Sequence, residues 1–403
     1  MRGIGGSTIE IELAIIKPVV ADFRPIQKEE FEERIQKAGR IMEVNNIVAT
    51  YVHAGTNLFY FSGMRWSASE RTVGALILPN GAIHYISPKF EYGTILDFMV
   101  VEGQVHCWEE QESPFELLFK VLNNKGITTG NLAIDEMTPF FVSDGLSNIR
   151  GSFEIINAKS ITAGCRMYKS KNEIAIMQAA MNITMEVQKA VARILYAGIS
   201  AQEVTDFIEK AHKAYGTKGS YFCIVLFGVD TSFPHGVKKP KNLKEGDVVM
   251  IDTGCVLHDY ISDITRTYVF GTPDEEQKHI WNIEKATQQA VFKAAQLNVT
   301  FGSVDDASRE ALKENGLSAD YALPGLPHRT GHGIGLDIHE WPYVVRNNEE
   351  QIKEWMTFSN EPMICVPNKF GIRLEDHIYM TSEGPKWFTE PAFSIENPFG
   401  LKD

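Results

Sequence analysis

The sequence has few cysteines, no long apolar run and no excess of positive charge. An odd number of scattered cysteines without a CxxC pair is not a disulfide framework and is typical of a reducing compartment; the five are Cys107, Cys165, Cys223, Cys255 and Cys365. No apolar run approaches the ~20 residues of a membrane span. Glu10 and Glu12 interrupt the one apolar stretch near the N-terminus, so a signal peptide is not expected. We therefore expect a cytoplasmic protein.

The charge balance excludes two further classes of partner. The chain has 39 Lys and Arg against 52 Asp and Glu, a net charge of −13. A general binder of nucleic acid or of anionic membranes needs a basic face, so neither partner is expected. The length of 403 residues predicts two domains, and the 44% of hydrophobic residues is ample for buried cores.

The first part of the chain is predicted to be a mixed α/β unit. Residues 1–24 show no clear periodicity and are interpreted as an arm. Helical periodicity is seen over 27–45 and 115–123. The Asn80-Gly81 pair predicts a hairpin turn. Strands are predicted over 47–51, 58–61, 73–78, 82–86 and 131–134.

The pattern changes near residues 163–168, where we place the domain boundary. The predicted domains are therefore 25–165 and 166–403. A long helix is expected over 170–197, with Ser170 as N-cap and Glu173 three residues later as in a capping box. Further helices are predicted over 201–215, 273–296 and 303–314.

One strand pair in the second domain carries two acids. Residues 248–271, VVMIDTGCVLHDYISDITRTYVFG, are typical of a β-hairpin. A turn centred on Leu257 and His258 places Asp252 directly opposite Asp263, with Cβ atoms roughly 5 Å apart. Two like charges at that spacing repel unless a proton or a metal lies between them.

A second hairpin carries another acidic pair. A turn centred on Asn368 places Glu361 opposite Glu375. Between the two hairpins lies HRTGHGIG, in which glycines on both sides present His332. Four carboxylates and one imidazole suit two divalent ions ~3.5–4 Å apart, bridged by shared carboxylates and a hydroxide. These ligand types fit Mn, Co, Fe or Zn and do not choose among them.

The motifs around these five residues carry a family resemblance. They are IDTG at Asp252, SDITRT at Asp263, GHGIG at His332, NEP at Glu361 and RLED at Glu375. The C-terminal half thereby resembles the pita-bread metallopeptidases, which include methionine aminopeptidase, aminopeptidase P and prolidase. The N-terminal half, with NLFYFSG, resembles the creatinase/prolidase N-terminal domain, which favours the prolidase and aminopeptidase P branch.

The resemblance implies an α+β protein in which a smaller mixed α/β domain precedes the pita-bread fold. It implies a metallopeptidase, most like Xaa-Pro dipeptidase, that cleaves Xaa-Pro bonds in dipeptides or short peptides with a metal-bridged hydroxide. The five residues above become ligands of two divalent ions, most simply manganese, in a homodimer. Glu361 also moves the proton.

Further residues match the family pattern or lie beside it. His235 in PHG matches a histidine that contacts substrate or shuttles a proton, and His339 in DIHEWP one that stabilises the oxyanion or the substrate. His328 is a candidate to line the same cavity. Arg373 shares the strand face of Glu375, where it pairs either with a metal-binding carboxylate or with a substrate carboxylate.

The sequence departs from the family at one position near the site. Where the family has E-P-G, this chain has Glu361-Pro362-Met363, which leaves the substrate open. The alternative is a non-peptidase hydrolase or lyase of a small polar metabolite on the same fold, as in ectoine-hydrolase-like, creatinase-like or dimethylsulfoniopropionate-lyase-like relatives. The lyases carry an extra Asp at the position of Gly254, which argues against that branch.

Overall fold

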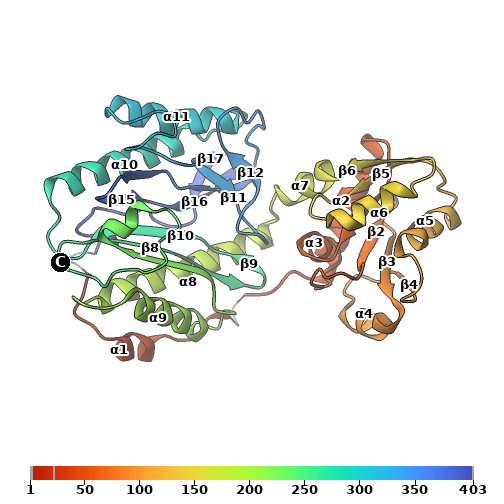
Figure 1. Ribbon diagram of the computed structural model, residues 1–403, viewed down its shortest axis with the longest axis horizontal. Coiled ribbons are helices and arrows are strands. Elements are labelled where there is room, and N and C mark those ends of the chain that lie inside the picture. Colours follow the sequence, from red (N-terminus) through yellow and green to blue (C-terminus); the bar gives the residue numbers. More distant parts are fainter. Residues whose placement is uncertain (1–2, 21–22, 402–403) are drawn as a thin grey trace. The chain divides into compact units, whose positions relative to one another are not determined.

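The computed structural model describes residues 3–20 and 23–401, which fold as two units (Figure 1). The smaller unit is residues 26–166, and the larger unit combines residues 1–25 with 167–403. The predicted arm belongs by its contacts to the larger unit. It contains helix α1, Ile9–Ile15, whose Glu12 pairs with Arg193 at 2.7 Å. Residues 1, 2, 21 and 22 of that arm lie outside the described part.

The smaller unit has a six-stranded sheet in the order β4-β3-β2-β1-β5-β6. β2 pairs antiparallel with β1 and β3, and the other pairs are parallel. Alternate residues face opposite sides: Tyr51 packs in the cluster that includes α5 and α6, whereas Thr50 meets Met42 of α2. The strands are Ile47–His53 (β1), Gly74–Ile77 (β2), Ile83–Pro88 (β3), Gln104–Trp108 (β4), Gly130–Ile134 (β5) and Phe153–Asn157 (β6).

Helices cover this sheet, and one of them replaces a predicted strand. Residues 58–61 lie in helix α3, so the strand prediction there is wrong. A short apolar run does not distinguish a strand from a buried helix, and here Gly55 and the left-handed Gly63 mark the helix ends. The helices are Lys28–Val44 (α2), Thr56–Ser62 (α3), Tyr92–Phe98 (α4), Pro114–Asn124 (α5), Phe140–Asn148 (α6) and Lys159–Arg166 (α7).

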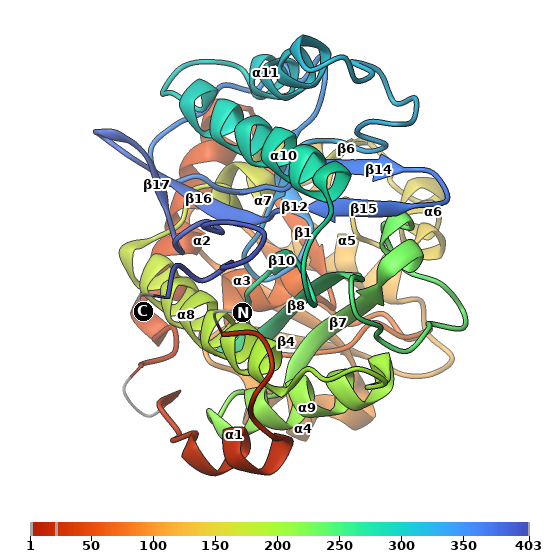
Figure 2. The same cartoon turned by 90° about the vertical axis from the view of Figure 1, so that its left-hand side faces the viewer.

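In the larger unit, long helices enclose the strands. α8 and α9 pack on one sheet, and α10 and α11 cover the strands on the other side (Figure 2). Ser170 caps α8 in a complete capping box with Glu173, as predicted, although α8 ends at Ile194, before the predicted residue 197. The helices are Lys171–Ile194 (α8), Ala201–Ala214 (α9), Glu275–Ala294 (α10) and Phe301–Glu314 (α11).

Three sheets of the larger unit hold the candidate site. One has the order β10-β8-β7 with β9 on β8, another β12-β11-β13-β16-β17, and a third is the pair β14-β15. The strands are Ser220–Phe227 (β7), Val248–Leu257 (β8), Tyr260–Ile261 (β9), Ile264–Val269 (β10), Gly331–Gly333 (β11), Glu340–Val344 (β12), Thr357–Asn360 (β13), Met363–Val366 (β14), Phe370–Arg373 (β15), Asp376–Thr381 (β16) and Gly384–Trp387 (β17).

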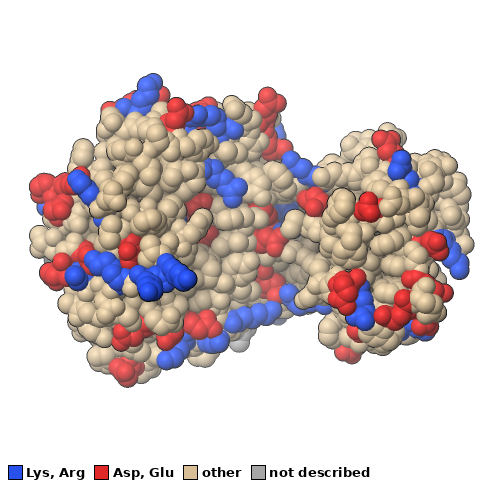
Figure 3. Space-filling model, viewed as in Figure 1, with Lys and Arg blue, Asp and Glu red and all other residues tan. Residues whose placement is uncertain are grey.

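Both signs of charge are interspersed on the side of the molecule seen in Figure 3. None of the helices in the described ranges is long and apolar enough to cross a membrane.

Candidate metal centre

The first hairpin turns one residue later than predicted. His258 and Asp259 form the turn with φ of 43° and 76°, in the left-handed region that two-residue hairpin loops require. The shift places Asp252 opposite Thr265, so the predicted pairing of Asp252 with Asp263 is wrong. Asp263 is two residues from Thr265 and therefore a diagonal neighbour of Asp252 on the same face.

Glycine at position 254 permits this geometry. A Cβ atom on Gly254 would lie 1.6 Å from the carbonyl oxygen of Ser262, a distance that no side chain tolerates. The backbone N–H of Cys255 donates to Ser262 Oγ at 2.8 Å, and Ser262 N–H donates to the Cys255 carbonyl at 3.1 Å. The close approach brings the segment with Asp263 against β8, and no aspartate fits at position 254.

The second hairpin has the predicted register. β13 and β16 pair Asn360 with Asp376, one residue away from each acid, and β14 and β15 continue the same register on the other side. Asn368 lies in the connecting turn with φ of 62°. Glu361 and Glu375 therefore stand opposite each other between the two strand pairs.

The two hairpins and β11 meet in one buried cluster. Ligand atoms of Asp263, His332 and Glu375 all lie within 4.8 Å of one another. His332 Nε2 is 3.0 Å from Glu361 Oε1 and 3.8 Å from Asp263 Oδ2. His332 Nδ1 is 3.0 Å from the Gly333 carbonyl. An Nδ1–H donated to that oxygen leaves the Nε2 lone pair facing the carboxylates, as a metal ligand requires.

Burial and neighbouring carboxylates raise the pKa values of Asp263 and Glu375. Burial and the charges of Glu375 and Asp252 hold the pKa of Asp263 well above its usual range. Burial and the charge of Glu361 do the same to the pKa of Glu375. Burial also disfavours ionised Glu361, but the adjacent His332 outweighs it and lowers the pKa of Glu361. A site of this kind needs positive charge to hold all its acids ionised.

Orphaned oxygen atoms show where that charge fits. Asp252 Oδ1, Asp263 Oδ1 and Glu375 Oε1 are buried and find no hydrogen-bond partner anywhere in residues 3–20 and 23–401. Buried carboxylate oxygens without donors are costly. Oxygen atoms of this type are the ligands that hard divalent cations prefer. The residues present therefore fit divalent metal ions.

Arg373 orients this carboxylate set from one side. Its Nη2 donates to Asp252 Oδ2, and its Nε donates to Thr265 Oγ1 at 3.1 Å. Thr265 Oγ1 donates in turn to Glu375 Oε2 at 2.7 Å. Arg373 was predicted to pair either with a metal-binding carboxylate or with a substrate carboxylate, and in the structure it pairs with Asp252, a carboxylate of the cluster.

A fully buried ion pair fixes the backbone behind Glu375. Arg266 Nη2 lies 2.7 Å from Asp376 Oδ1, with both side chains at 0% exposure. Arg266 Nη1 donates to the carbonyl oxygens of Thr265 and Glu375 at 3.0 and 2.9 Å. No role was expected for Arg266, Asp376 or Thr265, whose only signal in the sequence was their place inside the motifs SDITRT and RLED.

A cavity of about 370 Å³ opens onto the cluster, and the predicted histidines line it. The His339 ring lies 4.1 Å from that of His332, edge to face. Burial and the neighbouring His332 lower the pKa of His339 to about 4. The lining residues are His235, Tyr321, His328, Arg329, His332, His339, Val345, Glu361 and Arg373. Tyr321 and Val345 carried no sequence signal that set them apart, and the only signal of Arg329 was its place inside HRTGHGIG.

Of two further residues singled out in the sequence, His328 lines this cavity and Met363 does not. His328 Nδ1 lies 2.6 Å from the Arg329 carbonyl, and burial lowers the pKa of His328. Met363, which replaces the family glycine, is fully buried in a core cluster with Ile364 and Leu226. The Met363 side chain thus fills the core, and the cavity lining does not include it.

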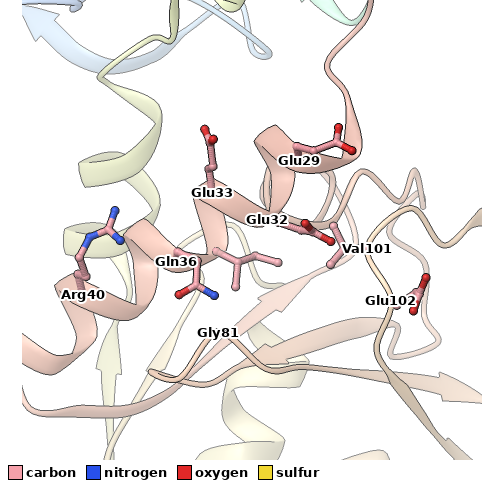
Figure 4. A pocket seen from close by; sticks show the side chains of 9 residues that line it. Glu29, Glu32, Glu33, Gln36, Arg40, Gly81, Val101 and Glu102 are labelled. Atoms are coloured by element: carbon pink, nitrogen blue, oxygen red, sulfur yellow. The ribbon is translucent and has the colours of Figure 1, made fainter.

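The smaller unit has a pocket of its own, of about 660 Å³, lined by four glutamates (Figure 4). The carboxylates do not converge on one point in that view. Lys28 Nζ lies 3.0 Å from Glu102 and 3.8 Å from Glu32, so a lysine already compensates two of the acids. This pocket does not have the geometry of a metal site.

Each of the two units matches a known protein family. Residues 175–382 match metallopeptidase family M24, and residues 34–168 match the creatinase/prolidase N-terminal domain. The Xaa-Pro dipeptidase of Pyrococcus furiosus is 30% identical over 89% of this chain and 98% of its own. The putative dipeptidase YkvY of Bacillus subtilis is 29% identical over 89% and 97%.

Solved structures agree. Dipeptidase PepE from Mycobacterium ulcerans superposes with a TM-score of 0.84 at 27% identity, covering 93% of this chain and 99% of that one. The dipeptidase from Pyrococcus horikoshii gives 0.79 at 28%, covering 89% and 98%. The predicted pita-bread fold with a creatinase-type N-terminal domain is therefore confirmed. This chain belongs to metallopeptidase family M24 and is a metallopeptidase that uses divalent metal ions.

Proposed function

We propose that this protein hydrolyses the Xaa-Pro bond of dipeptides and short peptides with two divalent metal ions. The observation that carries the proposal is the buried cluster of Asp263, His332 and Glu375 with its unpaired oxygen atoms. Relatives named Xaa-Pro dipeptidase at about 30% identity over nearly their whole length support the substrate class.

Five residues would hold the ions: Asp252, Asp263, His332, Glu361 and Glu375. Four carboxylates and one imidazole form an oxygen-rich set that suits Mn, Co, Fe or Zn, and we infer manganese from the family resemblance. The bound ions supply Lewis acidity that activates the attacking water and polarises the scissile carbonyl.

The remaining chemistry falls to side chains that face the cavity. Glu361 lines the cavity beside His332, where its carboxylate would accept the proton of the attacking water. It returns that proton to the imino nitrogen of proline as the C–N bond breaks. His339, whose pKa of about 4 keeps it neutral, donates a hydrogen bond to the oxyanion or substrate together with His235. His328 positions the peptide.

We also propose that the enzyme works as a homodimer in the cytoplasm. Its five cysteines are all free, three of them buried, which fits a reducing compartment. Size-exclusion chromatography with light scattering measures the mass directly, and a monomer mass at micromolar concentration would contradict the dimer.

The test is a substrate panel with purified enzyme loaded with Mn²⁺ or Co²⁺. We expect turnover of Xaa-Pro dipeptides, none of matched Xaa-Ala dipeptides, and loss of activity on chelation that added metal restores. Xaa-Pro-Yaa tripeptides separate dipeptidase from aminopeptidase activity. Absence of turnover on every dipeptide and tripeptide overturns the proposal, and turnover of ectoine or creatine instead establishes the metabolite alternative.

A further inference from the structure

A buried ion pair lies directly behind the loop that carries His339. Lys169 Nζ is 2.8 Å from Glu340 Oε1, and the two side chains are only 1% and 6% exposed. Lysine and glutamate are almost never this buried unless they are paired. Taking both charges out of water often costs more free energy than their attraction returns. The pair therefore points to a positional role rather than to added stability.

Lys169 is held at a fixed point of the fold. It directly precedes Ser170, the N-cap of α8, and its backbone N–H donates to the Trp355 carbonyl at 2.9 Å. The preceding residue, Tyr168, forms a β-bridge with Met356. The lysine is thus anchored both by a long helix and by the segment that leads into β13, so its ammonium group can hold its partner in place.

His339 has no such anchor of its own. Its ring packs edge to face on His332 but forms no hydrogen bond with any residue in the ranges 3–20 and 23–401. Residues 334–339 form an irregular loop, and Glu340 is the first residue of β12. A ring without hydrogen bonds takes its position from packing and from its own backbone. The side chain of the adjacent Glu340 is therefore the anchor next to His339 in the chain.

The loop passes close to the ion pair at Gly335. A Cβ atom there would lie 2.7 Å from Glu340 Oε1 and 2.8 Å from Lys169 Cε, so a larger residue would displace the ion pair. The Gly335 carbonyl accepts a hydrogen bond from the N–H of Ile261 at 2.9 Å, two residues before Asp263. The ion pair thus lies where the loop meets the hairpin that carries two of the proposed metal ligands.

We propose that the ion pair of Lys169 and Glu340 positions His339 over the metal cluster, which makes Lys169 a positioning residue of the reaction. The inference rests on the proposed Xaa-Pro hydrolysis, in which His339 stabilises the oxyanion or the substrate. A displacement of about 1 Å in such a group can cost about 100-fold in rate. Breaking the pair leaves the Glu340 charge buried without its partner. The carboxylate should then move toward water and take the backbone of His339 with it.

The test is a double-mutant cycle of Lys169→Met with His339→Ala, measured on one Xaa-Pro dipeptide with Mn²⁺-loaded enzyme. Lys169→Met alone should lower kcat/KM about 10- to 100-fold, with the metal content of wild type. In the His339→Ala background the same change should lower kcat/KM less than about 3-fold, because the group that the pair positions is already absent. Losses that multiply across the cycle overturn the proposal.

A second readout follows the ring itself in the metal-free protein, without any turnover. With isotope-labelled histidine, the ring protons of His339 and His332 should show a nuclear Overhauser contact, since the ring centroids lie 4.1 Å apart. His339→Ala identifies the signals. The contact should weaken or disappear in Lys169→Met, and an unchanged contact overturns the proposal.

Two variants make the result specific. Glu340→Gln keeps the length of the side chain and one acceptor for Lys169, so its loss of kcat/KM should be smaller. It also carries the same cycle if Lys169→Met does not fold. Arg193→Met is the matched control, because it breaks an ion pair with the buried Glu12 at the other end of α8. This control should lower Tm and leave kcat/KM as in wild type.

The outcomes separate the two proposals. If Xaa-Pro dipeptides are cleaved but the losses in the cycle multiply, the role of the ion pair fails while the hydrolysis stands. A loss of kcat/KM in Arg193→Met as large as in Lys169→Met also overturns that role, because general destabilisation then explains both. If the wild-type enzyme cleaves no Xaa-Pro substrate, the proposed function itself fails, and the ring contact still decides whether the pair positions His339.

Discussion

Replacing Arg266 by Met should destabilise the larger unit through one uncompensated charge. Arg266 and Asp376 are both fully buried. Arg266 donates to four acceptors: the carbonyl oxygens of Thr265, Glu375 and Glu390, and the carboxylate of Asp376. Methionine fills most of the volume but supplies none of these hydrogen bonds.

The magnitude follows from what remains after the change. Removing one partner of a buried ion pair costs about 3–5 kcal/mol, because the other charge stays buried. Asp376 keeps Thr389 Oγ1 at 2.7 Å and Gln288 Nε2 at 3.0 Å, two neutral donors that do not compensate a full charge. For a unit of this size the loss corresponds to roughly 6–20 °C in Tm. Because the Glu375 carbonyl is also released, metal affinity should fall about 10- to 100-fold.

Hydrogen–deuterium exchange of the metal-free protein measures the effect locally. Amides of β10 and β16 should lose protection in Arg266→Met, and amides of the smaller unit should not. The double variant Arg266→Met/Asp376→Leu removes both charges and should recover most of the lost stability. A single variant as stable as wild type, or a double variant no better than the single one, would refute the buried-charge argument.

Three further results are expected. Asp263→Asn should lose bound metal and activity together, whereas His339→Ala should lose activity and keep its metal; full turnover by Asp263→Asn would contradict the assigned site. Metal-free protein should lose stability as the pH rises above about 4. In the folded state the pKa values of Asp263 and Glu375 are raised above their unfolded values, so the folded state binds more protons than the unfolded state does. The stabilisation by metal, seen as a Tm shift, should therefore grow with pH, and a shift that shrinks between pH 5 and 8 would show that the acids are not coupled. Gly254→Ala should lose metal binding, since its Cβ collides with the Ser262 carbonyl, and a variant with normal metal content would show that the backbone yields there.

The sequence alone determined the family, the long helices and the second hairpin. The motifs around Asp252, Asp263, His332, Glu361 and Glu375 carry ligand chemistry that few other arrangements use, so residue type and spacing sufficed. The Ser170 cap of α8 is a local interaction of neighbouring residues, and local interactions can be read from sequence. The register of the second hairpin followed from its turn.

Tertiary structure decided what depends on contacts between distant segments. The first hairpin was misplaced by one residue, because two left-handed residues, His258 and Asp259, set its turn. No pattern within either segment shows that Arg266 meets Asp376, since 110 residues separate them. The contrast between Arg373 and Arg329 arises in the same way. Both line the cavity beside ligand motifs, and only the folded chain shows that protein acceptors surround the guanidinium of Arg373 whereas that of Arg329 stacks on Tyr343.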